Sequence, residues 1–406
     1  MSPLQLSQRS PRQLMNFGRR FPQKRPRQHN KRKASPSPLF LVILLQLFLL
    51  TWAFIISLTV SVHDSDISTE SHGATAVNPL VTGGNRSQLN GNVSLAHEIP
   101  GIELRISSRT TKNHQDFIQV IYPAKPTATR QKGIVLLLHA CTHSALKFFS
   151  TSLTCPDCVG LSEELRIVRL VLERGYMPVS LSSVDRKSGC WSNADFVRIQ
   201  TVLQHELFVN YDTVYAIGAS SGGAFASQLL VRGLVRGTLV MVMSLSKDVV
   251  DVWKRNPQPL FLAPMPRDKG TTSAAIRNYE ELKGLNRIDR EMIVLDTKTC
   301  APLPVTSSYL QERVPGMTAD ISMMLLEDLI RENHMDPLTM MLIVDPTQSN
   351  WREIVSPNNA THWLDKFALK PGYSPLAKAL HRAWAFHEYC SEVVLPALEF
   401  FERALG

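Results

Sequence analysis

From about residue 99 to the C-terminus, short apolar runs alternate with longer stretches in which apolar residues recur at helical spacing. The pattern predicts strands at 102–107, 116–123, 133–140, 176–183, 212–219, 238–246, 258–265 and 290–296. It predicts helices at 161–175, 193–208, 222–234 and 319–333. Strands that alternate with helices form a mostly parallel sheet with helices on both faces. We therefore expect an α/β domain over residues 99–406.

The chain has a different pattern before this domain. Residues 39–60, LFLVILLQLFLLTWAFIISLTV, carry no charge and would be apolar on every side of a helix. A helix of about 20 apolar residues spans a bilayer, and the apolar region of a cleaved signal peptide runs to about 15 residues. We therefore predict a transmembrane signal anchor rather than a cleaved signal or a buried core helix. Residues 61–98 are polar and predict a flexible stalk.

The charge of the chain is concentrated at its N-terminus. The formal net charge is +9, and residues 1–38 hold ten Lys or Arg and no Asp or Glu, so the remainder carries 9 − 10 = −1. A nucleic-acid-binding fold would show its excess of basic residues on the domain, so we do not expect such a partner. A basic cytosolic tail orients the anchor and contacts anionic lipid. The chain is therefore predicted to be a single-pass type II membrane protein, with its domain in the endoplasmic reticulum or Golgi lumen or at the cell surface.

A lumenal domain gives meaning to two other features. Sequons at Asn85, Asn92 and Asn359 would then be glycosylated, and the six cysteines, which all follow the apolar segment, could form disulfides in any of 15 pairings. Cys155-Pro-Asp-Cys158 lacks the second Cys or His pair of a zinc site and a thioredoxin-like setting. We predict that these two cysteines form structural disulfides, either with each other or with two separate partners. No metal or nucleotide motif occurs, so no cofactor is expected.

The stretch VYAIGASSGGAF contains a G-x-S-x-G pattern where a predicted strand turns directly into a predicted helix. A nucleophile elbow needs this setting, because its turn strains the serine backbone and leaves no room for side chains two residues before and after. Gly218 and Gly222 provide the room, so Ser220 is predicted to be a nucleophile rather than part of an ordinary turn. Ser221 fits less well, because Ala219 would then lie two residues before it.

A serine nucleophile needs a base and an acid that orients the base. With such an elbow, the chain order is Ser, then Asp or Glu, then His. PLFLAPMPRD ends in Asp268, just after the predicted strand 258–265, and Asp268 is the predicted acid. Asp248, which follows the preceding predicted strand, is the alternative acid.

The base is expected before the last helix. In AWAFHEYCSEVVLPALEFFERAL, His387 lies where that amphipathic helix is predicted to begin, and His387 is the predicted base. About 90 residues separate it from the last predicted strand, and residues 300–380 are predicted to be an inserted helical cap. The alternative bases are His334, His362 and His381, of which His381 is expected on the same helical run as His387.

Two backbone N–H groups would bind the oxyanion. One belongs to Ser221, the residue after the nucleophile, and the other is expected from Cys141 in LLLHACTHSA, which resembles the H-G-x loop of hydrolases with His139 in the His position. Ala140 departs from that pattern, which has Gly there. If the loop required a positive φ at this position, Ala140 would cost about 1 kcal/mol and misplace the amide.

Taken together, residues 99–406 resemble the α/β-hydrolase superfamily. LLLHACTHSA, GCWS and VYAIGASSGGAFA are similar to motifs of its polyhydroxybutyrate-depolymerase-like and feruloyl-esterase-like branch, and PMPRDKGTT and AWAFHE to eukaryotic members known only by fold. The resemblance implies that Ser220 attacks an ester carbonyl, that His387 takes its proton, and that Asp268 orients the imidazole. An acyl-enzyme would form, and water would release the acid.

A binding or adhesion module without catalysis is the second hypothesis, since hydrolase folds also serve such functions. Ala140, the open choice of base and the anchor are compatible with it, whereas the Ser, Asp, His order favours an enzyme. The expected substrate is a small-molecule or polymer ester whose identity the sequence does not define. Trp191 is a candidate for lining its pocket, with a core position as the alternative.

Overall fold

The computed structural model describes residues 99–107, 117–124, 131–285, 287–288, 292–355 and 374–406. The predicted tail, anchor and stalk lie outside these residues, as do the sequons at Asn85, Asn92 and Asn359 and the alternative base His362. Among the helices of the described residues, none is long and apolar enough to span a membrane. The membrane anchor therefore stays a prediction.

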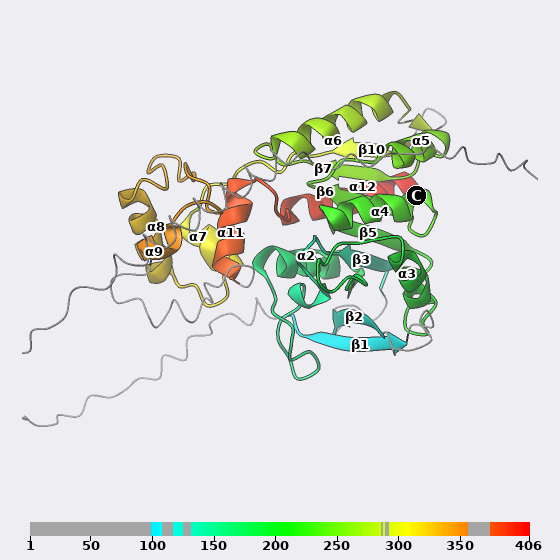
Figure 1. The fold of residues 1–406 in the computed structure, drawn as a ribbon, viewed down its shortest axis with the longest axis horizontal. Coiled ribbons are helices and arrows are strands. Elements are labelled where there is room, and N and C mark those ends of the chain that lie inside the picture. Colours follow the sequence, from blue (N-terminus) through cyan, green and yellow to red (C-terminus); the bar gives the residue numbers. More distant parts are fainter. Residues whose placement is uncertain (1–98, 108–116, 125–130, 286, 289–291, 356–373) are drawn as a thin grey trace, which may run out of the picture. The chain divides into compact units, whose positions relative to one another are not determined.

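Within the described residues, eight strands form one sheet in the order β1-β2-β4-β3-β5-β6-β7-β10 (Figure 1). The strands from β4 to β10 in this order are parallel, and β2 and β1 are antiparallel at one edge. The strands are β1 (Gly101–Ser107), β2 (Phe117–Pro123), β3 (Ile134–Leu138), β4 (Met177–Leu181), β5 (Val214–Ala219), β6 (Gly237–Met241), β7 (Leu260–Ala263) and β10 (Leu295–Thr297). The predicted mostly parallel sheet is confirmed.

Two predicted strands differ in extent from the observed ones. The last, at 290–296, is divided: Met292–Ile293 (β9) pairs with Arg287–Ile288 (β8) in a separate hairpin, and the sheet strand begins at Leu295. The strand predicted at 238–246 ends at Met241, because Val242 has a φ of 44°, which no extended strand accommodates.

Helices cover both faces of the sheet. One face packs against α2 and α12, and the other packs against α3, α4, α5 and α6. The helices are α2 (Ser162–Glu173), α3 (Asp195–Leu203), α4 (Ser221–Val231), α5 (Lys247–Arg255), α6 (Lys269–Leu282) and α12 (Val394–Leu405). The three predicted helices among these are confirmed as α2, α3 and α4.

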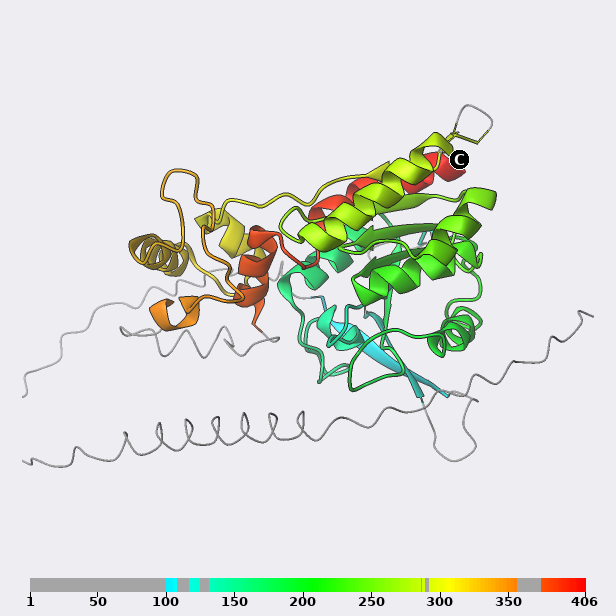
Figure 2. The ribbon, with the colours of Figure 1, turned by 45° about the horizontal axis from the view of Figure 1, so that its top comes forward.

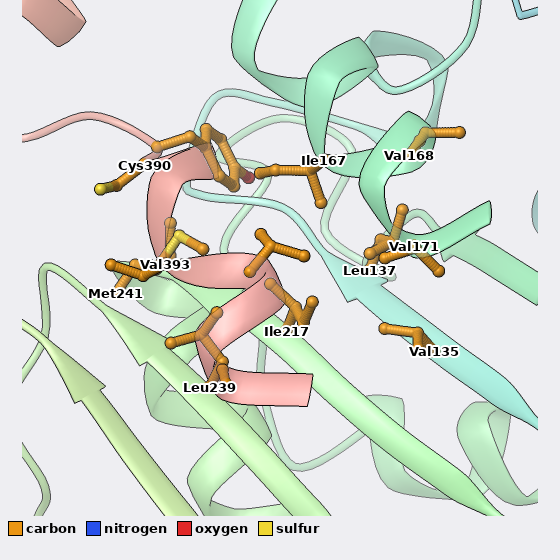
Figure 3. Close-up of a cluster of buried hydrophobic side chains, with 14 of the residues drawn as sticks. Val135, Leu137, Ile167, Val168, Val171, Ile217, Leu239, Met241, Cys390 and Val393 are labelled. Atoms are coloured by element: carbon orange, nitrogen blue, oxygen red, sulfur yellow. The ribbon is translucent and has the colours of Figure 1, made fainter. Parts of the chain in front are cut away.

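The central strands are buried on both sides, because alternate residues face opposite helical layers. In β3, Val135 and Leu137 face α2, as Figure 3 shows with Ile167 and Val171. Leu136, from the same strand, packs with the opposite layer. This double burial explains why the sequence of β3 is continuously apolar. It also holds the sheet rigidly, and the site residues follow the ends of its strands.

The described part of the predicted insertion is a helical cap, which we define as residues 300–355 and 374–384. It contains α7 (Ser307–Arg313), α8 (Ala319–Arg331), α9 (Trp351–Val355) and α11 (Pro375–Trp384), which lie together beside the sheet in both ribbon views (Figures 1 and 2). The cap has its own apolar core, which contains Leu310, Leu325, Leu329, Leu376 and Leu380. The helix predicted at 319–333 is confirmed as α8.

Covalent and ionic links join the cap to the sheet domain. Cys300 forms a disulfide with Cys390, which precedes α12. The buried guanidinium of Arg313 in α7 binds Glu163 of α2 at 2.9 Å. The other cysteines pair as Cys141–Cys190 and Cys155–Cys158. The predicted structural bridge in the C-x-x-C sequence is therefore present, formed within the pair.

Candidate active site

Ser220 occupies a strained turn between β5 and α4. Its φ of 53° and ψ of −121° lie where a residue with a side chain is rarely found, as a nucleophile elbow requires. A Cβ added to Gly218 would lie 2.2 Å from the Gly222 carbonyl oxygen, and one added to Gly222 would lie 2.1 Å from the Leu138 carbonyl oxygen. Both glycines are therefore required by the turn and by the close approach of α4 to β3.

We expect Gly222→Ala to lower the free energy of unfolding by about 1–3 kcal/mol, because backbone atoms must move to admit the new Cβ. Gly270→Ala is the matched control, since its added Cβ in α6 would meet nothing within 4 Å. Chemical unfolding of the two variants and the wild type measures the difference. Equal stability of the two variants would contradict the packing described for the elbow.

Asp268 and His387 are brought together from positions 119 residues apart. Asp268 follows β7 and caps α6, with Oδ1 accepting a hydrogen bond from the Thr271 N–H at 3.3 Å. Its Oδ2 lies 2.7 Å from Nδ1 of His387. Because Nδ1 donates to the carboxylate, Nε2 is left to accept a proton from a substrate or a hydroxyl. This is the relation between acid and base that a catalytic triad needs.

The surroundings of His387 correct one prediction. His387 does not lie at the start of the last helix, because α12 begins at Val394 and His387 belongs to the irregular segment 385–390. It is also not on the helical run of His381, because Ala385 adopts a left-handed conformation that ends α11 at Trp384. We call residues 385–390 the base segment.

The alternative acid and the described alternative bases lie elsewhere. Asp248 is in the first turn of α5 and lines a separate hollow with Gln228. His381 is on α11, and its Nδ1 is 3.8 Å from Glu388 Oε2. His334 is in the cap and lies 2.9 Å from the carbonyl oxygen of Glu332. None of these three lines the cavity that contains Ser220.

A cavity of about 300 Å³ opens above the elbow. Ser220 and His387 both line it, and Asp268 lies behind His387 rather than on the wall. The lining residues are Ala140, Cys141, Thr142, His143, Ala219, Ser220, Val242, Lys378, His387, Glu388 and Tyr389. Sequence reasoning missed His143, Lys378, Glu388 and Tyr389, because no motif connects these residues to the elbow.

Trp191 does not line the cavity and packs instead against the core, the alternative that the sequence left open. Its ring stacks on Phe225 of α4, with 4.8 Å between ring centroids, and its Nε1 donates to the His139 carbonyl oxygen at 2.8 Å. Its backbone N–H donates to the Ser221 hydroxyl at 2.9 Å. Trp191 therefore packs the elbow helix and supports the loop that carries His139.

The loop from His139 to His143 contributes Ala140, Cys141, Thr142 and His143 to the cavity lining. The Ala140 N–H donates to the Tyr389 hydroxyl at 2.9 Å. Within the described residues, the N–H groups of Cys141 and Ser221 meet no acceptor, as two donors to an oxyanion require. Ala140 does not have a positive φ, so the conditional cost considered for this position does not arise. In this loop the positive φ, 64°, is at Thr142.

His139 fixes the direction of the Cys141 N–H. Its Nε2 accepts a hydrogen bond from the Ser183 N–H at 3.0 Å, so its proton must be on Nδ1, which donates to the Ala140 carbonyl oxygen at 2.9 Å. That carbonyl shares a peptide plane with the Cys141 N–H. The Cys141–Cys190 disulfide holds the same loop from another side.

Burial lowers the pKa of His139 from 6.5 to about 4. The unfolded chain therefore binds more protons between these pH values, and stability falls as pH falls through this window. We expect this residue to contribute up to about 3 kcal/mol of that loss. Chemical unfolding at pH 7 and pH 4.5 should show a smaller decrease for His139→Asn than for the wild type. Equal decreases would contradict a neutral buried imidazole.

Comparisons with known proteins give limited information. No protein-family model matches the chain. No curated protein matches it. Similar solved structures include an esterase of Pyrococcus furiosus, with 14% identity, a TM-score of 0.36, and coverage of 56% of this chain and 89% of that chain.

Two further structures are comparably similar. A dienelactone hydrolase from Anabaena variabilis has 12% identity and a TM-score of 0.36, covering 58% of this chain and 99% of that one. A CIB-like hydrolase from Thermoplasma acidophilum has 12% identity and a TM-score of 0.35, covering 57% and 100%. At these TM-scores the similarity assigns no function to the chain.

Proposed function

We propose that the protein is a membrane-anchored serine hydrolase that cleaves carboxylic esters. The observation that carries the proposal is that a strained Ser220 and a carboxylate-bound His387 line the same cavity. The turn holds Ser220 at a positive φ, which costs about 1–2 kcal/mol and persists where surrounding structure enforces it. The membrane anchor and the lumenal or cell-surface location rest on the sequence alone, although the three disulfides fit an oxidising compartment.

In the proposed reaction, Ser220 Oγ attacks the ester carbonyl while Nε2 of His387 accepts its proton. Asp268 holds the imidazole through Nδ1 and stabilises the imidazolium that forms. The Cys141 and Ser221 N–H groups receive the oxyanion, each contributing about 3 kcal/mol. His387 then protonates the leaving alcohol, and the acyl group remains on Ser220 until water, activated by the same imidazole, releases the acid.

The test is hydrolysis of a panel of p-nitrophenyl esters by the purified full-length chain in detergent, with and without prior treatment with a fluorophosphonate. The proposal predicts turnover of at least one ester and its loss after treatment. A well-folded protein that neither turns over an ester nor reacts with the fluorophosphonate would favour the alternative, a binding module on a hydrolase-like fold.

A further inference from the structure

The base segment has no regular structure, so tertiary contacts must hold His387 in place. Two neighbours of His387 make those contacts on the cavity side. Tyr389 accepts a hydrogen bond from the Ala140 N–H, which ties the segment to the loop that carries Cys141. Glu388 is buried, and its Oε1 accepts a hydrogen bond from the Tyr389 N–H at 3.0 Å.

A buried carboxylate needs a compensating charge, and Lys378 supplies it. Lys378 Nζ donates to Glu388 Oε2 at 2.8 Å. Burial acts to lower the pKa of Lys378, but the nearby carboxylates of Glu388 and Glu164 raise it above its ordinary value. The side chain is therefore an ammonium at neutral pH.

The same ammonium also contacts His143, in the loop from His139 to His143 that carries the Cys141 N–H; we call this the oxyanion loop. Lys378 Nζ lies 3.3 Å from Nε2 of His143, and Nδ1 of His143 lies 3.1 Å from Glu164 Oε1. Since Nδ1 donates to a carboxylate, Nε2 accepts from Lys378. The backbone N–H of His143 donates to the Ala140 carbonyl oxygen at 3.2 Å. That carbonyl belongs to the same peptide unit as the Cys141 N–H. One side chain thus contacts both halves of the candidate site.

Lys378 belongs to the cap rather than to the sheet domain. Its helix, α11, buries Leu376 and Leu380 in the apolar core of the cap, and Figures 1 and 2 show α11 as the cap helix on the side of the sheet. The ammonium therefore extends from the cap into the cavity wall. The position of the cap helix can set the distance between the base segment and the oxyanion loop.

We propose that Lys378 is a positioning residue that holds the base segment and the loop from His139 to His143 at the separation that catalysis needs. This inference rests on the proposed hydrolase function and adds to it a residue that no motif indicated. Lys378 acts through Glu388 and His143 and needs no contact with the substrate. Its loss therefore affects the chemical step even for an ester too small to reach the cap.

The test compares full-length Lys378→Met with the wild type on p-nitrophenyl acetate. We expect kcat to fall about 10- to 100-fold with little change in KM, because a misplacement of about 1 Å in the reacting groups costs this much. The rate of fluorophosphonate labelling should fall in parallel. Lys254→Met, which breaks the more exposed ion pair with Glu281, is the control and should leave both rates unchanged.

A second variant separates positioning from charge compensation. Lys378→Met/Glu388→Gln leaves no unpaired buried carboxylate at residue 388, so it should recover the thermal stability that the single variant loses. The proposal predicts that kcat stays low in this variant, because the link to His143 is still absent.

Three results would overturn the inference: an unchanged kcat in folded Lys378→Met, a rise in KM alone, or recovery of kcat together with stability in the double variant. A folded wild type that does not react with the fluorophosphonate would instead refute the hydrolase proposal itself, and this inference with it.

Discussion

Ser220→Ala is expected to lower ester hydrolysis by about 10⁴-fold or more, which corresponds to about 5.5 kcal/mol of transition-state stabilisation. The hydroxyl is the only group of this residue that the proposed chemistry uses. Its backbone position is fixed by the elbow, where the Ser220 N–H donates to the Met241 carbonyl oxygen at 3.0 Å. Alanine can occupy the same strained turn, so the fold should survive.

The measurement is kcat/KM on the best ester of the panel, together with a thermal unfolding curve for each protein. Ser227→Ala is the matched control, because this buried serine lies on α4, the helix that follows Ser220, and its hydroxyl donates to the Ala224 carbonyl oxygen at 2.7 Å. It should remain within a few-fold of the wild type. A folded Ser220→Ala variant with wild-type turnover would remove Ser220 from the mechanism.

His387→Ala should produce a loss of similar size, about 10⁴-fold in kcat, because the serine would have no base and the leaving alcohol no acid. Removing members of a triad is strongly non-additive. Combining Ser220→Ala with His387→Ala should therefore lower the rate little further than either substitution alone. Steady-state kinetics of the two single variants and the double variant measure this.

His381→Ala is the control for the base, because His381 is the nearest alternative along the chain. Its ring approaches Glu388 but does not line the cavity. We expect less than a tenfold loss, arising from a weaker hold on the base segment. If His381→Ala abolished turnover and His387→Ala did not, the proposed base would be wrong while the serine-hydrolase class would survive.

The sheet and the elbow could be predicted from the sequence, because the local residue pattern in these segments matches the structure that they adopt. Continuous apolar runs identified the buried strands. Gly218 and Gly222 identified Ser220, because its turn leaves no room for side chains two residues before and after it. Asp268 followed from the same reasoning, since acids that follow parallel strands collect at one edge of the sheet.

The rest of the site depends on contacts that no local pattern encodes. The base segment lies after a cap helix, and a left-handed Ala385 rather than a glycine or proline ends that helix, so the sequence offered no signal for its boundary. Lys378 and His143 meet across 235 residues. The loop places its positive φ at Thr142 rather than at Ala140, and the sequence alone did not show which of these positions would carry it.

The most direct test of the account is the site of covalent modification by a fluorophosphonate. The full-length protein is labelled, digested, and mapped by mass spectrometry at single-residue resolution. The account predicts one adduct, on Ser220, that forms in the wild type and is absent from His387→Ala. An adduct on Ser221 or on another residue, or no adduct on a folded protein, would contradict the claim that Ser220 is an activated nucleophile.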